Sequence, residues 1–431
     1  MLFLRTKKQS SFKEMLRKVN QCIFLAITVF GVCPILEGQV FNPRAGCVVD
    51  ANGDCLPNSN LTAMPFLRIA PDARGGAMGD AGIALDPTPA SIHYNASSLA
   101  FAEKDAALSA TYTPWLQDLN LPDIYLAQLS GYKKIDALST VGFQFKYFSL
   151  GVINFRDPFG VDNGDGRPRE FQFGLAYARK LGDNLSVSVS GNYLFSALAP
   201  NQIVNGIEIT NATSFATDIG LTYKKKMELG GKDAQLSIGA AITNLGSKVT
   251  YTRDSIRDFI PTNLGLGTSL KLELDEYNTI TFALDFNKLM VPTSVSRNIL
   301  LDDGTTVMTN PEFSKDGDNV GDYRQKTLFE GVFGSFSDAQ GGFQEELQEI
   351  NYSLGAEYWY DQQFAARAGF FYEHPLKGAR KYFTVGLGIK YNIFNIDLSY
   401  LIPGNNRRSP LDNTLRFGMI FDLGNLQALD E

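Results

Sequence analysis

Histidine and tryptophan are scarce in this chain, with two residues of each among 431. His93 lies two positions after Ser91, but a hydrolase needs a nucleophile, a base and an orienting group that meet in space, and the sequence gives no sign of such a set. His374 precedes Pro375 at a predicted strand end and fits a turn or a membrane interface. No glycine-rich phosphate loop joins a strand to a helix. We therefore predict a protein that is not an enzyme and has no cofactor or metal site.

Long apolar segments are absent after residue 38, which excludes transmembrane helices from the rest of the chain. Residues 1–38 look like an export signal, with a basic start and an apolar run from Cys22 to Leu36. Met15 would begin a signal of more ordinary length. The formal net charge of −7 does not favour nucleic acid as a partner. An exported membrane protein without spanning helices must be a closed β-barrel, because only helices and closed barrels satisfy the backbone in lipid.

Cysteine is also rare, and removal of residues 1–38 would leave only Cys47 and Cys55. In an oxidising compartment these two cysteines would close a small loop, and the alternative is two unpaired thiols. Residues 39–103 are predicted to form an irregular N-terminal periplasmic or plug segment. Its part from 66 to 101 is rich in glycine and alanine, which indicates tight backbone packing inside the barrel lumen or against its periplasmic mouth.

Two-residue periodicity dominates the remaining chain and is clearest near its C-terminal end. Apolar and polar residues alternate from Tyr382 to Tyr391, and again from Phe394 to Tyr400 after a two-residue connection. Since successive side chains of a strand point to opposite faces, this pattern predicts a hairpin with one apolar and one polar face. Each strand has about the ~9–11 residues that a tilted strand needs to cross a bilayer. Aromatic residues lie near the strand ends, as at a membrane interface.

The same pattern recurs and predicts an all-β fold: a transmembrane antiparallel β-barrel of about fourteen strands, from 104 to 424, with an N-terminal plug-like segment. The expected strands span 104–113, 122–133, 138–149, 169–180, 184–197, 212–224, 233–244, 261–272, 276–287, 350–360, 363–373, 380–391, 393–401 and 412–423.

Short and long connections alternate between these strands. Short periplasmic turns and long outer loops are typical of outer-membrane barrels, so we predict an outer-membrane location with both termini in the periplasm. A pair of large soluble β-sandwiches would explain the alternation, but not the loop lengths or the aromatic content of 12%.

The loop from 288 to 349 is by far the longest, and loops of this length usually have a function. Its second half has apolar residues at helical spacing, at Leu328, Phe329, Val332, Phe333 and Phe336. Exposed aromatic residues on an outer loop would form a docking surface. The alternative is that this helix folds into the barrel mouth as a lid.

Two stretches resemble the PorV family of the type IX secretion system, which is related to FadL-type barrels. The first contains Phe66 to Ile69 and Pro71 to Gly82, and the second runs from Ser335 to Phe343 and continues through Glu345 to Leu347. An Asn-Pro-Ala step that the family often has is Asn95-Ala96-Ser97 here. The similarity covers essentially the whole mature chain. The family motif in the plug comprises Arg68, Asp72, Arg74, Gly75, Gly79 and Asp80.

The resemblance implies a non-enzymatic outer-membrane barrel. Such proteins bind the C-terminal signal domain of secreted cargo as it leaves a giant translocon barrel. They then deliver the cargo to a sortase-like attachment complex, which removes the signal and couples the cargo to lipopolysaccharide in the outer membrane.

We expect Phe333, Phe336 and Phe343 on the long loop to contact cargo or translocon, with Trp115 on the first outer loop as a weaker candidate. One alternative function is a FadL-like channel for hydrophobic small molecules, which would need an apolar site in the lumen and a lateral opening. Another is an outer-membrane hydrolase that acts on lipid through His93.

Overall fold

The computed structural model describes residues 40–50, 52–115, 123–156, 160, 162–199, 202–204, 207–252, 256–301, 306–315, 320–404 and 414–424. The predicted signal at 1–38, including Met15, lies outside these residues, as do positions 412–413 of the last predicted strand. The described chain divides into a small unit within 1–56 and 296–310, and a barrel unit within 57–295 and 311–431. No helix among the described residues is long and apolar enough to cross a membrane.

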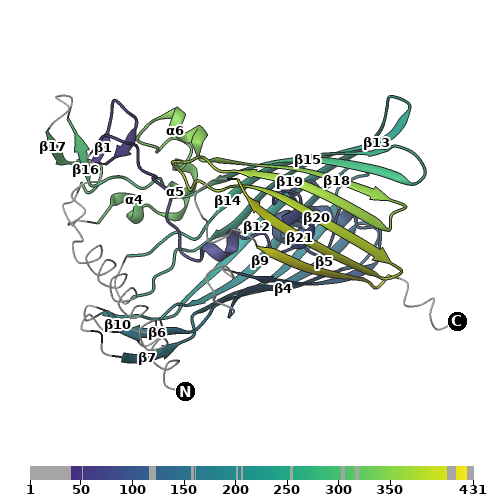
Figure 1. Cartoon of the computed structure of the whole chain (residues 1–431), viewed down its shortest axis with the longest axis horizontal. Helices are drawn as coiled ribbons and strands as arrows, with labels where there is room; N and C mark the ends of the chain where they lie inside the picture. The colour runs from purple at the N-terminus through teal and green to yellow at the C-terminus, as the bar shows by residue number, and fades with distance from the viewer. Residues whose placement is uncertain are drawn as a thin grey trace, which may run out of the picture. The chain divides into compact units, whose positions relative to one another are not determined.

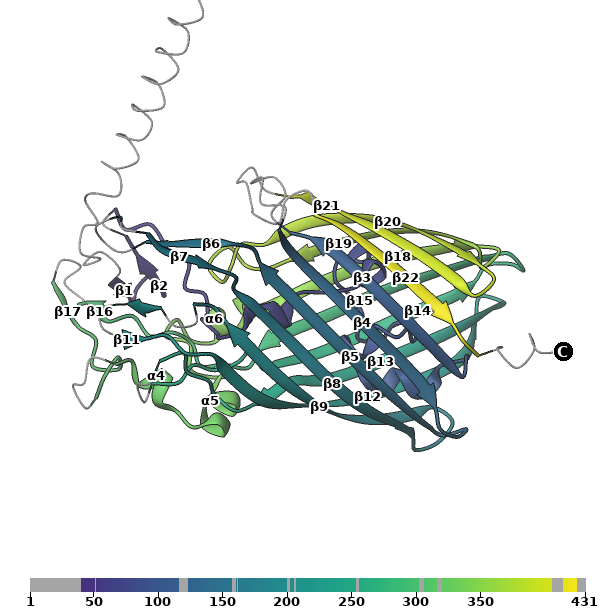
Figure 2. The ribbon, with the colours of Figure 1, turned by 90° about the horizontal axis from the view of Figure 1, so that it is seen from below.

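The barrel unit contains a closed antiparallel barrel, in which β22 pairs with β3 and β9 pairs with β12 (Figures 1 and 2). All the predicted strands are confirmed, with end positions that differ by a few residues. The strands are β3 (Ala106–Pro114), β4 (Ile124–Lys134), β5 (Ser139–Leu150), β8 (Arg169–Lys180), β9 (Leu185–Ala197), β12 (Ala212–Leu229), β13 (Lys232–Gly246), β14 (Asn263–Glu273), β15 (Asn278–Leu289), β18 (Ile350–Tyr360), β19 (Phe364–Tyr372), β20 (Lys381–Tyr391), β21 (Phe394–Pro403) and β22 (Leu415–Asp422).

The faces of the strands are inverted relative to a soluble protein. On β9, the side chains of Ser186, Ser188 and Ser190 are buried in the lumen, whereas Val189 between them is 51% exposed on the outside. The same alternation holds on β20, where Thr384 is buried and Leu387 is exposed. An apolar outer surface around a polar interior is stable in a bilayer and excludes the two soluble sandwiches.

Short turns lie at one end of the barrel, here called the turn end, and the long connections lie at the other, here called the loop end (Figure 1). The first strand begins and the last strand ends at the turn end, where the Leu423 amide donates to the Ala106 carbonyl at 2.9 Å. The loop end carries two small hairpins, β6 (Ile153–Arg156) with β7 (Asp162–Gly166) and β10 (Ile203–Val204) with β11 (Ile207–Glu208). It also carries the helices α4 (Asp322–Gln325), α5 (Leu328–Gly334) and α6 (Phe343–Gln348).

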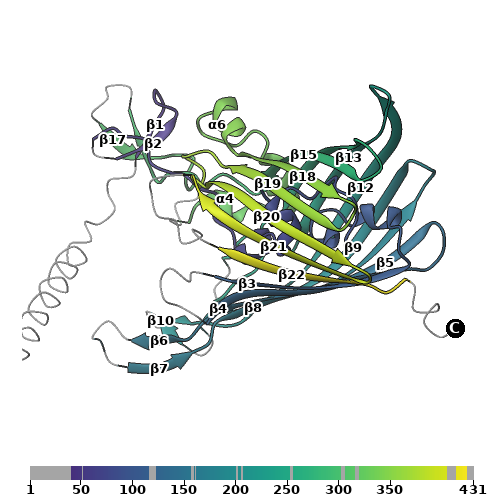
Figure 3. The ribbon, with the colours of Figure 1, turned by 45° about the vertical axis from the view of Figure 1, so that its right-hand side comes forward.

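Residues 65–101 form a plug inside the barrel, as Figure 3 shows for the dark blue segments enclosed by the strands. The plug contains η1 (Pro65–Arg68), α2 (Ala73–Ala77), α3 (Ser91–Tyr94) and η2 (Ala96–Phe101). Most of its residues are buried.

The segment that leads into the plug lies at the loop end. The Asn58 amide donates to the Leu376 carbonyl at 2.7 Å, and the Ala63 amide donates to the Phe259 carbonyl at 2.9 Å. Both acceptors belong to connections at the loop end. The chain therefore enters the lumen from the loop end and reaches β3 at the turn end. An even strand number places the ends of the barrel on one side, but it does not constrain a segment that is threaded through the lumen first.

The small unit has a sheet in the order β17 (Val307–Thr309), β16 (Asn298–Leu300), β1 (Val40–Asn42) and β2 (Cys47–Val49). A disulfide joins Cys47 to Cys55. We expected an irregular chain here. Because β1 pairs in parallel with β16 from a distant part of the sequence, no local pattern reveals this sheet.

Candidate functional site

The plug motif begins with a capped helix. Asp72 precedes α2, and its carboxylate accepts a hydrogen bond from the Gly75 amide at 2.8 Å. The other oxygen of the same carboxylate accepts from the Tyr94 hydroxyl at 2.6 Å. The side chain of Asp72 thus caps a short helix that would be marginal alone and ties it to α3. A Cβ atom on Gly75 would meet the Tyr94 hydroxyl at 2.2 Å, so the close approach of these two segments requires glycine.

Arg74 extends from α2 into a chain of alternating charges on the barrel wall. Its guanidinium contacts both carboxylate oxygens of Glu357 on β18, at 2.9 and 2.7 Å. Glu357 also accepts from Arg367 on β19 at 2.6 Å, and Arg367 donates to Asp397 on β21 at 2.6 Å. These four charges are largely withdrawn from solvent. Because each has a partner of opposite sign, the network compensates for much of its desolvation cost.

Asp80 and Gly79 fix the turn that follows α2. The carboxylate of Asp80 forms an ion pair with Arg416 on β22 at 3.0 Å and accepts from the hydroxyl of Tyr382 on β20. Gly79 has φ of 70°, and a Cβ there would lie 2.6 Å from the Phe370 backbone nitrogen. The backbone of the plug therefore lies directly against the barrel wall, in a conformation that favours glycine.

Arg68 lies closer to the loop end, where its guanidinium lies 3.6 Å from the Glu373 carboxylate. Arg380 donates to the same carboxylate at 2.8 and 3.0 Å. Burial alone would raise the pKa of Glu373, but Arg380 and then Arg68 outweigh it, so the pKa lies below its usual value. The six motif residues predicted from the sequence thus lie in the plug and bind it to the wall at several points.

Two further residues that hold the plug were not predicted. Asp285 on β15 accepts hydrogen bonds from the Gly82 and Ile83 amides at 2.7 and 2.9 Å. Asn95 donates to the Ile83 carbonyl at 3.1 Å and to the Thr222 hydroxyl at 3.0 Å. A carboxylate on the lumen face of an otherwise regular strand was the available signal for Asp285, and Asn95 is the first residue of the altered Asn-Ala-Ser step.

His93 is not positioned as the base of a serine nucleophile. Its Nδ1 atom lies 3.2 Å from the Lys146 ammonium nitrogen, while Lys146 also donates to the Ile69 carbonyl at 3.2 Å. The Ser91 hydroxyl accepts from the Thr88 amide at 3.0 Å and takes part in the local turn. The hydrolase hypothesis therefore gains no geometric support.

The second half of the long loop forms an aromatic surface at the loop end, in the barrel unit. A capping box begins α5, with Thr327 and Glu330 each bonding the backbone of the other. Val332 is on the buried side of α5, whereas the aromatic side chains on the other side of the helix are exposed. We call this the loop surface. It consists of Phe329 (62% exposed), Phe333 (66%), Phe336 (44%) and Phe343 (75%), with Leu347 at its edge.

Buried ion pairs anchor the loop surface to the barrel. Lys288, at the end of β15, contacts Glu346 at 2.9 Å and Glu349 at 2.6 Å. Lys377, from the β19–β20 connection, contacts Glu345 at 2.5 Å and Glu349 at 3.1 Å. Burial would raise the pKa of Glu349, but the Lys377 and Lys288 ammonium groups outweigh it and the pKa is lowered. The base of α6 is thereby fixed, while Phe343 projects from its start.

The predicted loop residues differ in how much surface they present. Phe333, Phe336 and Phe343 are exposed, whereas a lid folded into the barrel mouth would bury them. Trp115 is only partly accessible, because it packs edge-on against Phe148 with ring centroids 6.2 Å apart. Residues 116–122, which follow it in the first outer loop, lie outside the described chain.

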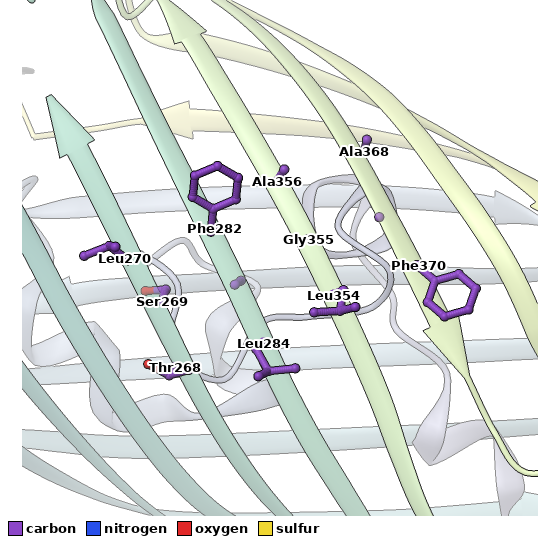
Figure 4. Close-up of a pocket in the computed structure, with 12 residues that line it drawn as sticks. Thr268, Ser269, Leu270, Phe282, Leu284, Leu354, Gly355, Ala356, Ala368 and Phe370 are labelled. Atoms are coloured by element: carbon purple, nitrogen blue, oxygen red, sulfur yellow. The ribbon is translucent and has the colours of Figure 1, made fainter. Parts of the chain in front are cut away.

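A groove of about 500 Å³ lies on the outer wall formed by β14, β15, β18 and β19 (Figure 4). Ala356 and Ala368 line it, together with the larger side chains of Phe282, Leu354 and Phe370. On the inner side of the same wall, a Cβ on Gly355 would lie 2.7 Å from the Met78 carbonyl oxygen. The plug thus packs against the inside of this wall, and every strand pairing across it is continuous.

Comparison with known protein families gives one match. Residues 56–296 match the family described as type IX secretion system protein PorV. The chain belongs to the PorV family. The matched region includes the plug and the strands from β3 to β15, and the family assignment agrees with the resemblance read from the plug motif. This PorV-family chain is therefore an outer-membrane β-barrel of the type IX secretion system.

The chain is also similar in fold to several solved structures. The Pseudomonas putida toluene transporter TodX is 11% identical, with a TM-score of 0.45, over 84% of this chain and 98% of that chain. The Ralstonia pickettii toluene transporter TbuX is 13% identical, with a TM-score of 0.44, over 81% and 96%. A Pseudomonas aeruginosa FadL homologue is 9% identical, with a TM-score of 0.39, over 82% and 98%. A search of curated proteins found no match.

Proposed function

We propose that this PorV-family barrel is the cargo shuttle of its secretion system. It binds the C-terminal signal domain of secreted proteins as they leave the giant translocon barrel. It then carries them to the sortase-like attachment complex, which joins them to lipopolysaccharide at the cell surface. In this role the protein is not an enzyme and needs no cofactor, since its task is to bind one partner and release it to another.

The observation that carries this proposal is the loop surface. Four phenylalanine side chains are exposed within one short segment, and buried ion pairs fix the base of α6 in that segment. Exposed aromatic clusters are costly in water and are typical of the centres of protein interfaces. A fixed base also reduces the entropy that would be lost when a partner binds.

The lengths of the connections support an orientation with the turn end in the periplasm. The loop surface then faces the cell exterior, where folded cargo emerges. Residues 58–63, which precede the plug, then also approach the barrel from outside. The plug is bonded to the wall on several sides, so cargo recognition takes place on the loops and not through the lumen.

The test is a triple substitution, Phe333→Ser, Phe336→Ser and Phe343→Ser, in cells that secrete a cargo with the C-terminal signal domain. Tyr391→Ser is the matched control, because Tyr391 is an equally exposed aromatic residue at the turn end. We expect the triple variant to assemble normally but to lose most cargo attachment, with cargo retained at the translocon. Normal attachment in the triple variant would overturn the assignment of these residues.

The alternative function is a channel for hydrophobic small molecules. Purification of the parent protein and the triple variant distinguishes it from a shuttle. A channel would copurify with an apolar ligand in the lumen, and its uptake activity would not depend on the loop phenylalanines. A shuttle would copurify with secreted proteins, the translocon barrel or the attachment complex, and the triple variant would lose them.

A further inference from the structure

A second cavity opens at the turn end of the barrel, far along the lumen from the loop surface. It has a volume of about 750 Å³, and parts of the plug that include Pro87 and Phe101 form one side of it. We call it the turn-end vestibule. It is lined by eight cationic and five anionic side chains, although the chain as a whole has a formal net charge of −7. The lining of the vestibule is therefore net positive, whereas the chain as a whole is net negative.

The cations converge from separate strands. Alternation along β12 turns Lys224 and Lys226 toward the interior, and Gln235, the cross-strand partner of Lys226, contacts Asp86 of the plug. Further lysines come from β8, β14 and β20. Lysines on these strands that line the cavity are Lys180, Lys224, Lys226, Lys271 and Lys390.

Three of these lysines already contact a carboxylate, although two of them share one. Lys224 and Lys271 both contact the carboxylate of Asp86, at 2.8 and 3.1 Å, and Lys390 lies 3.3 Å from Asp422. Lys180 and Lys226 have no ion pair with any carboxylate among the described residues. They are the charges that a ligand would find available.

Phe101 places two of the ammonium groups over one aromatic ring. The Lys180 nitrogen lies 5.3 Å from the ring centroid and the Lys224 nitrogen lies 5.5 Å from it. Such contacts attract each cation to the ring and limit where its long side chain extends. Two positive charges from different strands are thereby directed to the same part of the cavity, where a multiply charged anion would interact with both.

We propose that the turn-end vestibule binds a multiply charged phosphate-bearing anion, either free in the periplasm or as a lipid headgroup. Arg74 lines the cavity, but its guanidinium already forms two hydrogen bonds to Glu357. It is therefore not available for a two-point contact with the anion. The available groups are lysine ammonium ions, which bind phosphate as point charges. The plug closes the inner side of the cavity. The anion therefore binds at the turn end and does not pass through the lumen.

The test uses the full-length barrel in zwitterionic detergent, titrated calorimetrically with inorganic pyrophosphate and, separately, with a short-chain phosphatidic acid. The site variant is Lys180→Gln with Lys226→Gln. The control is Lys133→Gln with Lys232→Gln, which removes the same charge from exposed positions near the turn end that do not line the cavity. Circular dichroism of both variants establishes that the barrel is folded.

We expect pyrophosphate to bind the parent and the control equally, and the site variant to bind about tenfold or more weakly. Binding should weaken as salt rises from about 50 mM to about 300 mM. Tighter binding of the phosphatidic acid, with the same loss in the site variant, would identify a lipid headgroup as the source, and binding of pyrophosphate alone a free anion. Absence of binding of both probes to the parent, or an equal loss in the control, would overturn the proposal.

Discussion

Arg74 of the plug and Glu357 of the barrel wall form a two-point ion pair, at 2.9 and 2.7 Å, across a sequence separation of 283 residues. Arg367 donates to the same carboxylate from the neighbouring strand. Two guanidinium groups thus depend on one buried carboxylate. The lumen segment and the wall are joined by this contact, so the stability of the plug and that of the barrel are coupled.

The first prediction concerns Glu357. Replacement by Gln removes the negative charge and leaves Arg74 and Arg367 buried with one fewer partner. Breaking a buried pair in this way costs roughly 3–5 kcal/mol. We expect E357Q to unfold at lower temperature in detergent, and its plug to become sensitive to protease at lower temperature than the barrel strands.

Two controls make this result specific. Glu276→Gln, at an exposed turn, should leave both measurements unchanged. The double variant Arg74→Gln with Glu357→Gln should lose less stability than the sum of the single variants, because the two side chains act together. Strict additivity would contradict the coupling.

Gly79 supplies the second prediction. Alanine at this position would have to adopt φ of 70°, with its Cβ 2.6 Å from the backbone of Phe370. Strain and overpacking together should cost about 1–3 kcal/mol or more. The thermal unfolding midpoint of G79A should therefore fall, while that of G182A should not, because a Cβ at Gly182 meets no atom within 4 Å. Equal midpoints for the two variants would show that the plug can move away from the wall.

The third prediction is a pH dependence at the base of the loop surface. The pKa of Glu349 is lowered in the folded protein, because Lys377 and Lys288 together outweigh the effect of burial. Its ion pairs therefore stabilise the fold fully above the ordinary glutamate pKa of 4.5, and that stability is lost as the pH falls through the lowered value. The protection factors of the amides in residues 343–349, which compare the observed exchange rate with the intrinsic rate at the same pH, should fall on acidification below that point. In E349Q the protection factors should be lower already at neutral pH and should change less with acid, and an unchanged acid response would argue against this carboxylate as the cause.

The disulfide gives a fourth prediction. Cys47 and Cys55 are joined, so alkylation of the unreduced protein should leave both unlabelled, and reduction should make both reactive. The measurement is mass spectrometry of the peptide that carries the two cysteines. Labelling of both without reductant would contradict the bond.

The sequence predicted the barrel more completely than the paths within it. Alternation along each strand is a local pattern, so fourteen strands and the short turns could be recognised one at a time. The parallel pairing of β1 with β16 joins residues 258 positions apart at Val40 and Asn298, and no local pattern encodes such a pairing. The entry of the plug from the loop end was missed for the same reason, since Asn58 meets Leu376 only in the folded chain.

The same limit applies to the candidate sites: their own residues could be predicted from the sequence, but their distant partners could not. The motif residues Arg68 to Asp80 were singled out by resemblance, but their partners on the wall, such as Glu357 and Arg416, lie hundreds of positions away and were not. The exposure of Phe343 was expected from its place in a long loop. The half-buried state of Trp115 was not, because it depends on Phe148 of β5, two strands away in the barrel.

The most direct test of the shuttle account is site-specific photocrosslinking in cells. A photoreactive amino acid at position 343 or 333, on the loop surface, should yield crosslinks to secreted proteins that carry the C-terminal signal domain. The same amino acid at Tyr391, exposed at the turn end, should yield none. Crosslinks to cargo from the loop surface alone are the predicted result. Equal crosslinking from both ends, or none from either loop position while cargo is being secreted, would contradict the account.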